Sequence, residues 1–435
     1  MRRTKTWIGR AGWLCSGLVA ATLSGPGSAV GKEESNPPAL QATGPRAGKG
    51  DPAREAALGR RRRLRAREMG LPLEGQPGRW NAITDVPGVE VGQVTLIRGE
   101  GRLQAGQGPV RTGVTAILPH GKNSCRLSVA AVHSLNGNGE LTGSHWVNES
   151  GFLDSPILLT NTHSVGTVRD AVIAWGNRQF PTQKLMEEPF ALAVVGETHD
   201  GFLNDIQGQH VTRDHVFAAL DGAKAGPVAE GNVGGGTGMV TSEFKGGIGT
   251  SSRIVQLPQG RYTVGVLVQA NYGRRADLRI LGAPVGREIA DLMPVGPKVP
   301  GGVPPREKVR EKDGSILVVV ATDAPLLPHQ MMRMARRPSL GMGRLGAVSY
   351  QSSGDIFIAF GPAEPEADTR GLQHFAVLPN DAIDPLLQAT VQATEEAILN
   401  ALFAAETMVG IDGHTVYGLP HDRLMTILRK YRVVK

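Results

Sequence analysis

The stretch from Asp313 to Leu327 reads Asp-Gly-Ser-Ile-Leu-Val-Val-Val-Ala-Thr-Asp-Ala-Pro-Leu-Leu. After Gly314 it is almost entirely apolar or β-branched, which is typical of a strand buried on both faces of a sheet. Ser315 is the first residue of this predicted strand, and the glycine before it leaves the preceding carbonyl uncrowded. The Ser315 hydroxyl could therefore attack the Gly314 carbonyl carbon and form an ester. Hydrolysis of that ester would leave Ser315 as a new N-terminus, whose amine can serve as a general base.

A Gly-Ser pair is a weak motif, because it also begins many ordinary strands. A second Gly-hydroxyl junction occurs at Gly249-Thr250, but the Ser-Ser-Arg that follows is polar and does not look like the start of a strand. Gly314-Ser315 is therefore the preferred cleavage site. The loop before it, residues 283–314, is rich in Pro, Gly and charge, as an exposed new C-terminus would be.

The first 29 residues have the pattern of a secretory signal peptide. An apolar run from Ala11 to Leu23 precedes a small-residue site, Gly27-Ser28-Ala29, and follows a basic segment that contains Arg2, Arg3, Lys5 and Arg10. The run is too short to span a bilayer comfortably, so we expect export to the periplasm or the medium without stable membrane insertion. Once residues 1–29 are removed, Cys125 is the only cysteine, which excludes an intramolecular disulfide.

The net charge of +7 is concentrated near the N-terminus. Residues 1–70 hold 14 of the 47 Lys and Arg but 5 of the 40 Asp and Glu, which leaves 33 basic and 35 acidic residues in the body of the chain. The Arg60-Arg61-Arg62-Arg63 run is typical of a solvated arm, with contact to a membrane surface or a polyanion as the alternative. The body has no basic excess, which argues against a nucleic-acid partner.

Segments with strand and helix patterns alternate from about residue 81 onward. Predicted strands cover residues 83–92, 94–97, 114–118, 127–132, 190–198, 262–271, 315–322 and 355–360. Predicted helices cover residues 165–178, 215–222, 326–341 and 384–407. This interleaving predicts an α/β or α+β protein in which residues 71–435 form one layered domain. Ahead of it, residues 30–70 are expected to be a disordered basic tail with a short helix near residues 57–68.

Polar residues at the ends of the predicted strands are the remaining candidates for chemistry. Asn271 ends one strand, and Ser353 and Asp355 precede another with a spacing that puts both side chains on one face. A turn that only leads into the strand is the simpler interpretation of that pair. The glycine-rich segment 231–238 lacks the Lys-Ser/Thr ending of a P-loop, so nucleotide phosphate binding is disfavoured. Close packing of a loop near a site, or backbone N–H groups that face an anion, are the favoured interpretations. The histidines show no metal-ligand spacing, so a structural role is favoured for them. Gly-x-Ser-x-Gly is absent, which argues against an α/β-hydrolase.

Several blocks together resemble the L-aminopeptidase D-Ala-esterase/amidase family, which includes the β-peptidyl aminopeptidases. In chain order, the blocks are residues 81–92 (Asn-Ala-Ile-Thr-Asp-Val-Pro-Gly-Val-Glu-Val-Gly), 196–201 (Gly-Glu-Thr-His-Asp-Gly), 231–239, 266–273 and 314–327. The resemblance spans about residues 70–430. It implies a four-layer αββα sandwich and a precursor that cleaves itself before a nucleophilic Ser or Thr, here into residues 71–314 and 315–435. It also implies a homo-oligomer of such α/β pairs that needs no metal or cofactor.

Carried over by position, the resemblance makes Ser315 the nucleophile, with Ser353 and Asp355 as the pair that orients it. The Asn271 amide would donate into the oxyanion hole, and Glu197 would hold the substrate ammonium. His199 stands where the family is expected to have an aromatic phenol. Because an imidazole is shorter and can carry charge, this departure puts the substrate range and pH optimum in question. The loop from Pro284 to Asp313 is also longer than expected.

The resulting hypothesis is an exported serine N-terminal-nucleophile aminopeptidase, a hydrolase acting on small peptides, amides or esters through an acyl-enzyme on Ser315. The alternatives are an amidase for oligomers of ω-amino acids, an acyltransferase, and an uncleaved scaffold that only binds. The sequence does not distinguish L-, D- and β-residues, since no motif encodes the shape of a pocket.

Overall fold

The computed structural model describes residues 63–124, 126–181, 192–296, 314–363, 366–367 and 370–435. Arg61–Lys435 clusters as one compact unit. The predicted signal peptide (1–29), most of the predicted tail and the loop segment 297–313 lie outside the described residues. In the described part of the chain, no helix is both long and apolar enough to cross a membrane.

Two sheets form the centre of this unit. The first has the strand order β1-β2-β5-β6, with β1 (Glu90–Arg98), β2 (Val110–Leu118), β5 (Ile157–Asn161) and β6 (Val194–Thr198). The second has the order β4-β3-β12-β11-β10-β9, with β4 (Phe152–Leu153), β3 (Ser128–Gly137), β12 (Gly354–Pro362), β11 (Ser315–Thr322), β10 (Gly260–Asn271) and β9 (Gly247–Leu257). β11 pairs antiparallel with β10 and parallel with β12.

Strand β11 is apolar from Ile316 to Ala321 because both of its faces are covered. Leu317, Val319 and Ala321 point into the core between the two sheets, whereas Ile316, Val318 and Val320 belong to the core under the helices. A strand has a side-chain period of two, so a strand in the middle of two cores needs apolar residues at every position. The prediction of a doubly buried strand is therefore confirmed.

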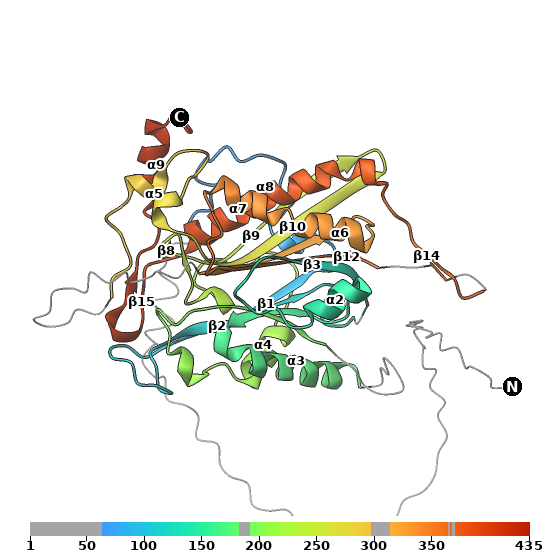
Figure 1. The fold of residues 1–435 in the computed structure, drawn as a ribbon, viewed down its shortest axis with the longest axis horizontal. Helices are drawn as coiled ribbons and strands as arrows, with labels where there is room; N and C mark the ends of the chain where they lie inside the picture. Colours follow the sequence, from blue (N-terminus) through green and yellow to red (C-terminus); the bar gives the residue numbers. More distant parts are fainter. Residues whose placement is uncertain (1–62, 125, 182–191, 297–313, 364–365, 368–369) are drawn as a thin grey trace, which may run out of the picture. The chain divides into compact units, whose positions relative to one another are not determined.

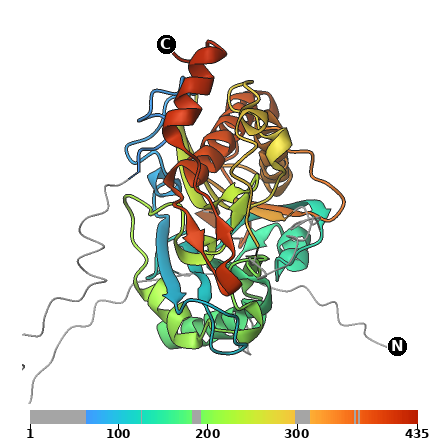
Figure 2. The same cartoon turned by 90° about the vertical axis from the view of Figure 1, so that its left-hand side faces the viewer.

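Helices cover the outer face of each sheet (Figure 1). α3 (Val165–Gln179) and α4 (Arg213–Asp221) pack on the first sheet, and α6 (Pro328–Ala335), α7 (Pro338–Arg344) and α8 (Asp384–Ala404) pack on or beside the second. Figure 2 shows the same stack after a quarter turn, with the green helices below the sheets and the orange-red helices above. The layers are helix, sheet, sheet and helix, so the predicted αββα sandwich is confirmed.

Shorter elements surround these layers. They are α2 (Ser144–Ser150), α5 (Val285–Glu288), α9 (His421–Lys430) and the two-stranded ribbons β7–β8 (Val240–Thr241, Phe244–Lys245), β13–β14 (Glu366–Ala367, Gln373–His374) and β15–β16 (Met408–Val409, Thr415–Val416).

Three local predictions were wrong. Ile83–Asp85 is a 3-10 turn, because the Asp85 carboxylate accepts hydrogen bonds from the backbone N–H groups of Trp80 and Ala82, and the strand begins only at Glu90. The helix predicted over 326–341 is two helices, since Pro338 supplies no N–H to continue the first. Described residues 63–68, expected to be helical, contain no helix.

Strand β9 was missed. Its buried residues include Thr250, Ser251, Ser252 and Arg253, so a run of apolar residues does not mark it. The hydroxyls are satisfied by the neighbouring backbone: Thr250 Oγ1 donates to the Val266 carbonyl at 2.6 Å and Ser251 Oγ to the Ala393 carbonyl of α8 at 2.6 Å. The assumption that Gly249-Thr250 does not begin a strand was thus wrong, because both residues lie within one.

The glycine-rich segment is a packing device, as predicted. Its centre forms a buried 3-10 turn, Gly234–Gly236, between the two sheets. A Cβ atom added to Gly236 would lie 2.4 Å from the Ile248 nitrogen, and one added to Gly235 would lie 2.7 Å from the Leu159 carbonyl oxygen. Only glycine allows the backbone to approach this closely. The Lys245 ammonium, fully buried, donates to the Met239 and Gly246 carbonyls at 2.8 Å and fixes the same segment.

Candidate active site

Three strands of the second sheet place their polar ends at one edge. Ser315 begins β11, Gly354 begins the parallel strand β12, and Asn271 ends the antiparallel strand β10. In the ladders, Ser315 lies between these two residues, paired with Asn271 on one side and with Gly354 on the other. The topology therefore brings together residues that are up to 83 positions apart in the sequence. Ser315 is 7% exposed, so this edge is sheltered from bulk water.

Ser353 lies against the bond predicted to be cleaved. Its Oγ is 2.9 Å from the Gly314 carbonyl oxygen and 2.6 Å from Asp355 Oδ1. A serine hydroxyl has one proton, so it can donate to the carbonyl or to the carboxylate, but not to both at once. The Ser353 and Asp355 side chains are buried, at 2% and 0% exposure. The pair can thus polarise the Gly314 carbonyl and supply or remove a proton beside it.

A glycine between Ser353 and Asp355 is required by the local packing. A Cβ atom added to Gly354 would lie 2.1 Å from the carbonyl oxygen of Asn138. Asn138 in turn donates its side-chain amide to the Ser352 carbonyl at 2.7 Å. The turn before β12 is therefore held against the end of β3, which fixes the position of Ser353.

The Asn271 side chain is oriented by two hydrogen bonds and is fully buried. Its Oδ1 accepts from the Val240 backbone N–H at 2.8 Å, which assigns the amide orientation. Its Nδ2 donates to the His199 carbonyl oxygen at 3.1 Å. An amide nitrogen has two protons, so it can make more than one hydrogen bond. The structure places this amide beside Ser315 through the strand pairing.

Glu197 comes from the other sheet, on β6, and is 4% exposed. Its Oε1 accepts from the Glu140 backbone N–H at 3.1 Å, and its Oε2 accepts from the Thr162 hydroxyl. Burial raises the pKa of this carboxyl, while these two donors oppose the shift. A Cβ atom added to Gly139 would lie 3.4 Å from Glu197 Oε1 and 3.5 Å from the Gly354 Cα. Gly139 thus lies between the Glu197 carboxylate and the start of β12, which pairs with Ser315. The space between these two groups holds little more than one atom.

His199 is linked to this group through its backbone. Its carbonyl oxygen accepts from Asn271, while its side chain is exposed. A Cβ atom added to the following Gly201 would lie 2.6 Å from the imidazole Cε1, so the ring lies over that turn. The structure therefore brings the His199 backbone to the site, and it places the imidazole at the surface.

Sequence analysis did not single out several residues that support the site. Thr162 and the Glu140 N–H orient Glu197, and the Val240 N–H orients Asn271. Asp200 is fully buried and accepts from Asn204 Nδ2 at 3.0 Å, and burial raises its pKa to about 7. No spacing in the sequence marks Glu140, Thr162 or Val240, because each of them bonds to a partner from another segment.

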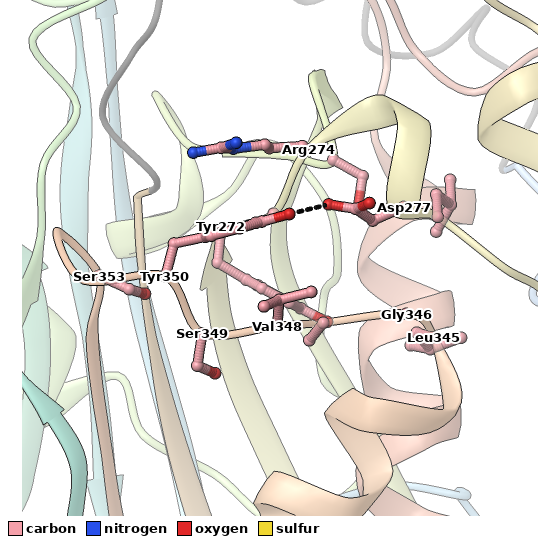
Figure 3. A pocket seen from close by; sticks show the side chains of 13 residues that line it. Tyr272, Arg274, Asp277, Leu345, Gly346, Val348, Ser349, Tyr350 and Ser353 are labelled. Carbon is pink, nitrogen blue, oxygen red and sulfur yellow. Dashed lines mark hydrogen bonds between the residues drawn. The ribbon is translucent and has the colours of Figure 1, made fainter.

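A pocket opens beside Ser353 (Figure 3). The turn after β10 contributes Tyr272, Arg274 and Asp277, and the segment between α7 and β12 contributes Tyr350. The Tyr350 hydroxyl donates to Asp277 Oδ2 at 3.0 Å, and the Arg274 guanidinium carbon lies 3.7 Å from the centre of the Tyr350 ring. Across the described residues, no group of three or more His, Cys, Asp or Glu is arranged to hold a metal ion.

The chain is similar to known proteins over most of its length. The model of peptidase family S58 matches residues 81–416. The β-peptidyl aminopeptidase BapA of Sphingosinicella microcystinivorans is 50% identical over 372 residues, which cover 85% of this chain and 92% of that protein. BapA of Sphingosinicella xenopeptidilytica is also 50% identical, over 369 residues that cover 84% and 91% of the two chains.

Solved structures show the same fold. The L-aminopeptidase D-Ala-esterase/amidase of Ochrobactrum anthropi, described as a variant of the Ntn hydrolase fold, superposes with a TM-score of 0.77 at 43% identity, covering 85% of this chain and 99% of that one. A β-aminopeptidase from Burkholderia sp. superposes with a TM-score of 0.73 at 45% identity, covering 84% and 99%. The chain therefore belongs to peptidase family S58, and it is a hydrolase of the N-terminal-nucleophile aminopeptidase and amidase class.

Proposed function

We propose that the chain cleaves itself between Gly314 and Ser315 and then uses Ser315 as an N-terminal nucleophile. The observation that carries this proposal is the 2.9 Å contact from Ser353 Oγ to the Gly314 carbonyl oxygen, the oxygen that would become negative during attack. The Ser315 hydroxyl adds to the Gly314 carbonyl carbon, the peptide C–N bond breaks, and the nitrogen takes a proton to become the Ser315 amine. Water then hydrolyses the resulting ester and leaves a Gly314 carboxylate.

The same atoms would serve substrate turnover. The freed Ser315 amine takes the proton of its own hydroxyl, which attacks the substrate carbonyl and expels the leaving amine. Ser353, held by Asp355, lies where it can pass protons at this point. The Asn271 amide donates to the oxyanion, where one donor is worth about 3 kcal/mol of barrier. Water hydrolyses the acyl-enzyme and restores Ser315.

Glu197 would select substrates that carry a free amine. Its carboxylate is buried near the start of β12, which pairs with Ser315, and burial raises its pKa. A substrate ammonium would supply that charge through charge-assisted hydrogen bonds. Binding the amine close to the reacting carbonyl restricts the reaction to the first residue of a peptide, amide or ester.

β-Amino acid amides are the first substrate class to test, because two relatives named β-peptidyl aminopeptidases are 50% identical to this chain. L- and D-residues and ω-amino acid oligomers complete the panel. Transfer of the acyl group to an amine uses the same ester and is the alternative reaction. Export through residues 1–29 and assembly into a homo-oligomer of cleaved pairs are further parts of the proposal, supported by the N-terminal sequence pattern and by the family resemblance.

Intact-mass analysis of purified wild-type protein and Ser315→Ala tests the cleavage. The wild type should yield a fragment of residues 315–435 that begins with Ser315, and the variant should stay one chain. A fragment that begins at Thr250 would move the nucleophile to β9. An uncleaved wild type without hydrolytic activity would favour the scaffold that only binds.

A further inference from the structure

The peptide bond between Met239 and Val240 is held on both sides. The Val240 N–H donates to Asn271 Oδ1 at 2.8 Å. The Met239 carbonyl, in the same peptide unit, accepts from Lys245 Nζ at 2.8 Å and from the Gly246 N–H at 3.0 Å. A trans peptide unit is planar, so its C=O and its N–H point in opposite directions. The groups that hold the Met239 carbonyl therefore also aim the N–H that reaches Asn271.

This N–H decides which atom of the Asn271 side-chain amide acts as the donor. With Oδ1 bonded to Val240, the nitrogen Nδ2 takes the other position, where it donates to the His199 carbonyl at 3.1 Å. If the peptide between Met239 and Val240 turned over, a carbonyl oxygen would face Asn271, and the side-chain amide would have to present Nδ2 to it. Oδ1 would then take the other position, and an oxygen without a proton cannot donate to an oxyanion.

Lys245 is the side chain that holds this carbonyl, and it is fully buried. Within the described residues, all of its side-chain hydrogen bonds go to backbone carbonyls, those of Gly236, Met239 and Gly246 at 3.3, 2.8 and 2.8 Å. A lysine is almost never fully buried unless it is paired, since burying its charge is costly. Three carbonyls match the three protons of an ammonium. Lys245 therefore joins the two ends of residues 236–246, the segment that contains the 239–240 peptide.

The β7–β8 hairpin within this segment is strained, and a second buried cation fixes it. The two strands are joined by Ser242 and Glu243, whose φ angles are 48° and 58°. A two-residue loop with positive φ at both positions favours Asn-Gly, and neither residue here is a glycine. Arg275, 2% exposed, donates to the carbonyls of Ser242 and Glu243 at 3.0 and 2.6 Å, and its backbone N–H donates to Glu243 Oε2 at 2.8 Å. Strained backbone persists where its surroundings hold it in place, and it is common at active sites.

We propose that Lys245 is a positioning residue for the reaction: it holds the peptide between Met239 and Val240 in the orientation that makes Asn271 present its amide nitrogen to the oxyanion. The inference rests on the proposed role of Asn271 and deepens it, because it names the side chain that sets the direction of this donor. Lys245 is buried away from any substrate, so its effect should appear in kcat and not in KM.

The test is a double-mutant cycle on kcat for a β-amino acid anilide. Values of kcat are referred to the amount of the residue 315–435 fragment, so that slow self-cleavage is not counted as slow turnover. Asn271→Ala should lower kcat by about 100-fold or more. Lys245→Met, which keeps the length of the side chain and removes its donors, should lower kcat by about 10- to 100-fold with KM within about threefold. In the double variant, Lys245→Met should lower kcat by no more than about a further twofold, because the amide that Lys245 orients is already gone.

Two further variants separate orientation from stability. Arg253 is buried like Lys245 but pairs with Glu396 of α8, so Arg253→Ala should lower the urea midpoint and leave kcat of the folded, cleaved enzyme within about twofold. Thr241→Val is a milder change in the hairpin, for the case that Lys245→Met does not fold. It removes the 2.7 Å bond from Thr241 Oγ1 to the Ala270 carbonyl of β10. It should lower kcat by about 3- to 10-fold in the wild type and by much less beside Asn271→Ala.

The cycle distinguishes failure of the inference from failure of the proposed function. If folded Lys245→Met keeps the wild-type kcat, or loses the same factor in the wild-type and Asn271→Ala backgrounds, the inference is overturned and the role of Asn271 stands. If Lys245→Met is unfolded, the same two results with Thr241→Val decide. A wild-type kcat in folded Asn271→Ala would overturn the proposed role of Asn271, and the inference with it.

Discussion

Replacing Ser353 with alanine should slow self-cleavage far more than it destabilises the fold. The Ser353 hydroxyl is the donor that lies 2.9 Å from the Gly314 carbonyl oxygen. In oxyanion holes of other enzymes, loss of one donor costs a factor of about 100 to 1,000. Here the same proton is shared with Asp355 Oδ1 at 2.6 Å, so the donor is directed at the carbonyl for only part of the time. We therefore expect the lower end of that range, a rate reduction of about 100-fold or roughly 2.7 kcal/mol of barrier.

The assay is a pulse of cell-free synthesis followed by a chase, with the fragment of residues 315–435 quantified over time. Ser353→Thr, which keeps a hydroxyl at this position, is the matched control and should retain most of the rate. Ser315→Ala gives the background without a nucleophile. Far-ultraviolet circular dichroism and the urea midpoint of the uncleaved Ser353→Ala chain establish that it is folded.

One result would refute the reasoning directly. If Ser353→Ala is folded and cleaves at the wild-type rate, the contact to Gly314 has no part in the chemistry, and another donor must stabilise the oxyanion. If Ser353→Thr is as slow as Ser353→Ala, the defect comes from the packing around Gly354 and not from loss of the hydroxyl.

Three further predictions concern charge and stability. Glu197→Gln should lower kcat/KM for substrates with a free amine by about 10- to 100-fold. Because burial raises the pKa of Glu197, wild-type kcat/KM should fall as pH drops through that raised pKa. A pH profile of the variant should lack this acidic decrease in kcat/KM. Burial raises the pKa of Asp200 to about 7, so this carboxyl stays protonated in the native state at pH values where the unfolded chain ionises. The free energy of unfolding should therefore fall as pH rises from about 4 to 7, by up to about 4 kcal/mol. Urea unfolding at pH 5 and 8 should show a smaller change in this free energy for Asp200→Asn than for the wild type, and an unchanged pH dependence would contradict the assignment. Arg253→Ala breaks a buried 2.7 Å pair with Glu396 and should cost about 3–5 kcal/mol, whereas Arg423→Ala at an exposed pair should cost less than about 1 kcal/mol by the same urea assay.

Local chemistry was enough to predict the parts of the fold that bury regular apolar faces. β11 was predicted with its observed limits because every residue from Ile316 to Ala321 faces a core. The helix at residues 165–178 was also predicted, since it buries one regular face, as at Val168, Ala171, Val172 and Trp175. The proline at 338, by contrast, was not recognised as the boundary between two helices.

Polar elements could not be predicted in this way. β9 is the edge strand of the second sheet, yet its hydroxyls and arginine are buried. The partners of Thr250, Ser251 and Arg253 lie on β10 and on α8, more than 130 residues later for Ser251 and Arg253. A strand of this kind has no apolar alternation to detect, because its burial is compensated by hydrogen bonds instead of by composition. The hydrogen bond by which Thr162 orients Glu197 could not be predicted either, because a polar contact between two segments leaves no pattern in the composition of either segment.

The sequence by itself determined the doubly buried strand, the Gly314-Ser315 step at its start and the polar residues available near strand ends. Only the tertiary structure decided that Asn271, Ser315 and Gly354 are direct neighbours, that Ser353 contacts the Gly314 carbonyl, and that Arg274 stacks on Tyr350 at the pocket. The physical reason is that strand propensity and burial act over a few residues, whereas the registers of β10, β11 and β12 are fixed by cores on both sides of the sheet. A shift of one residue in any of these registers would turn its apolar side chains to the opposite face and separate the site.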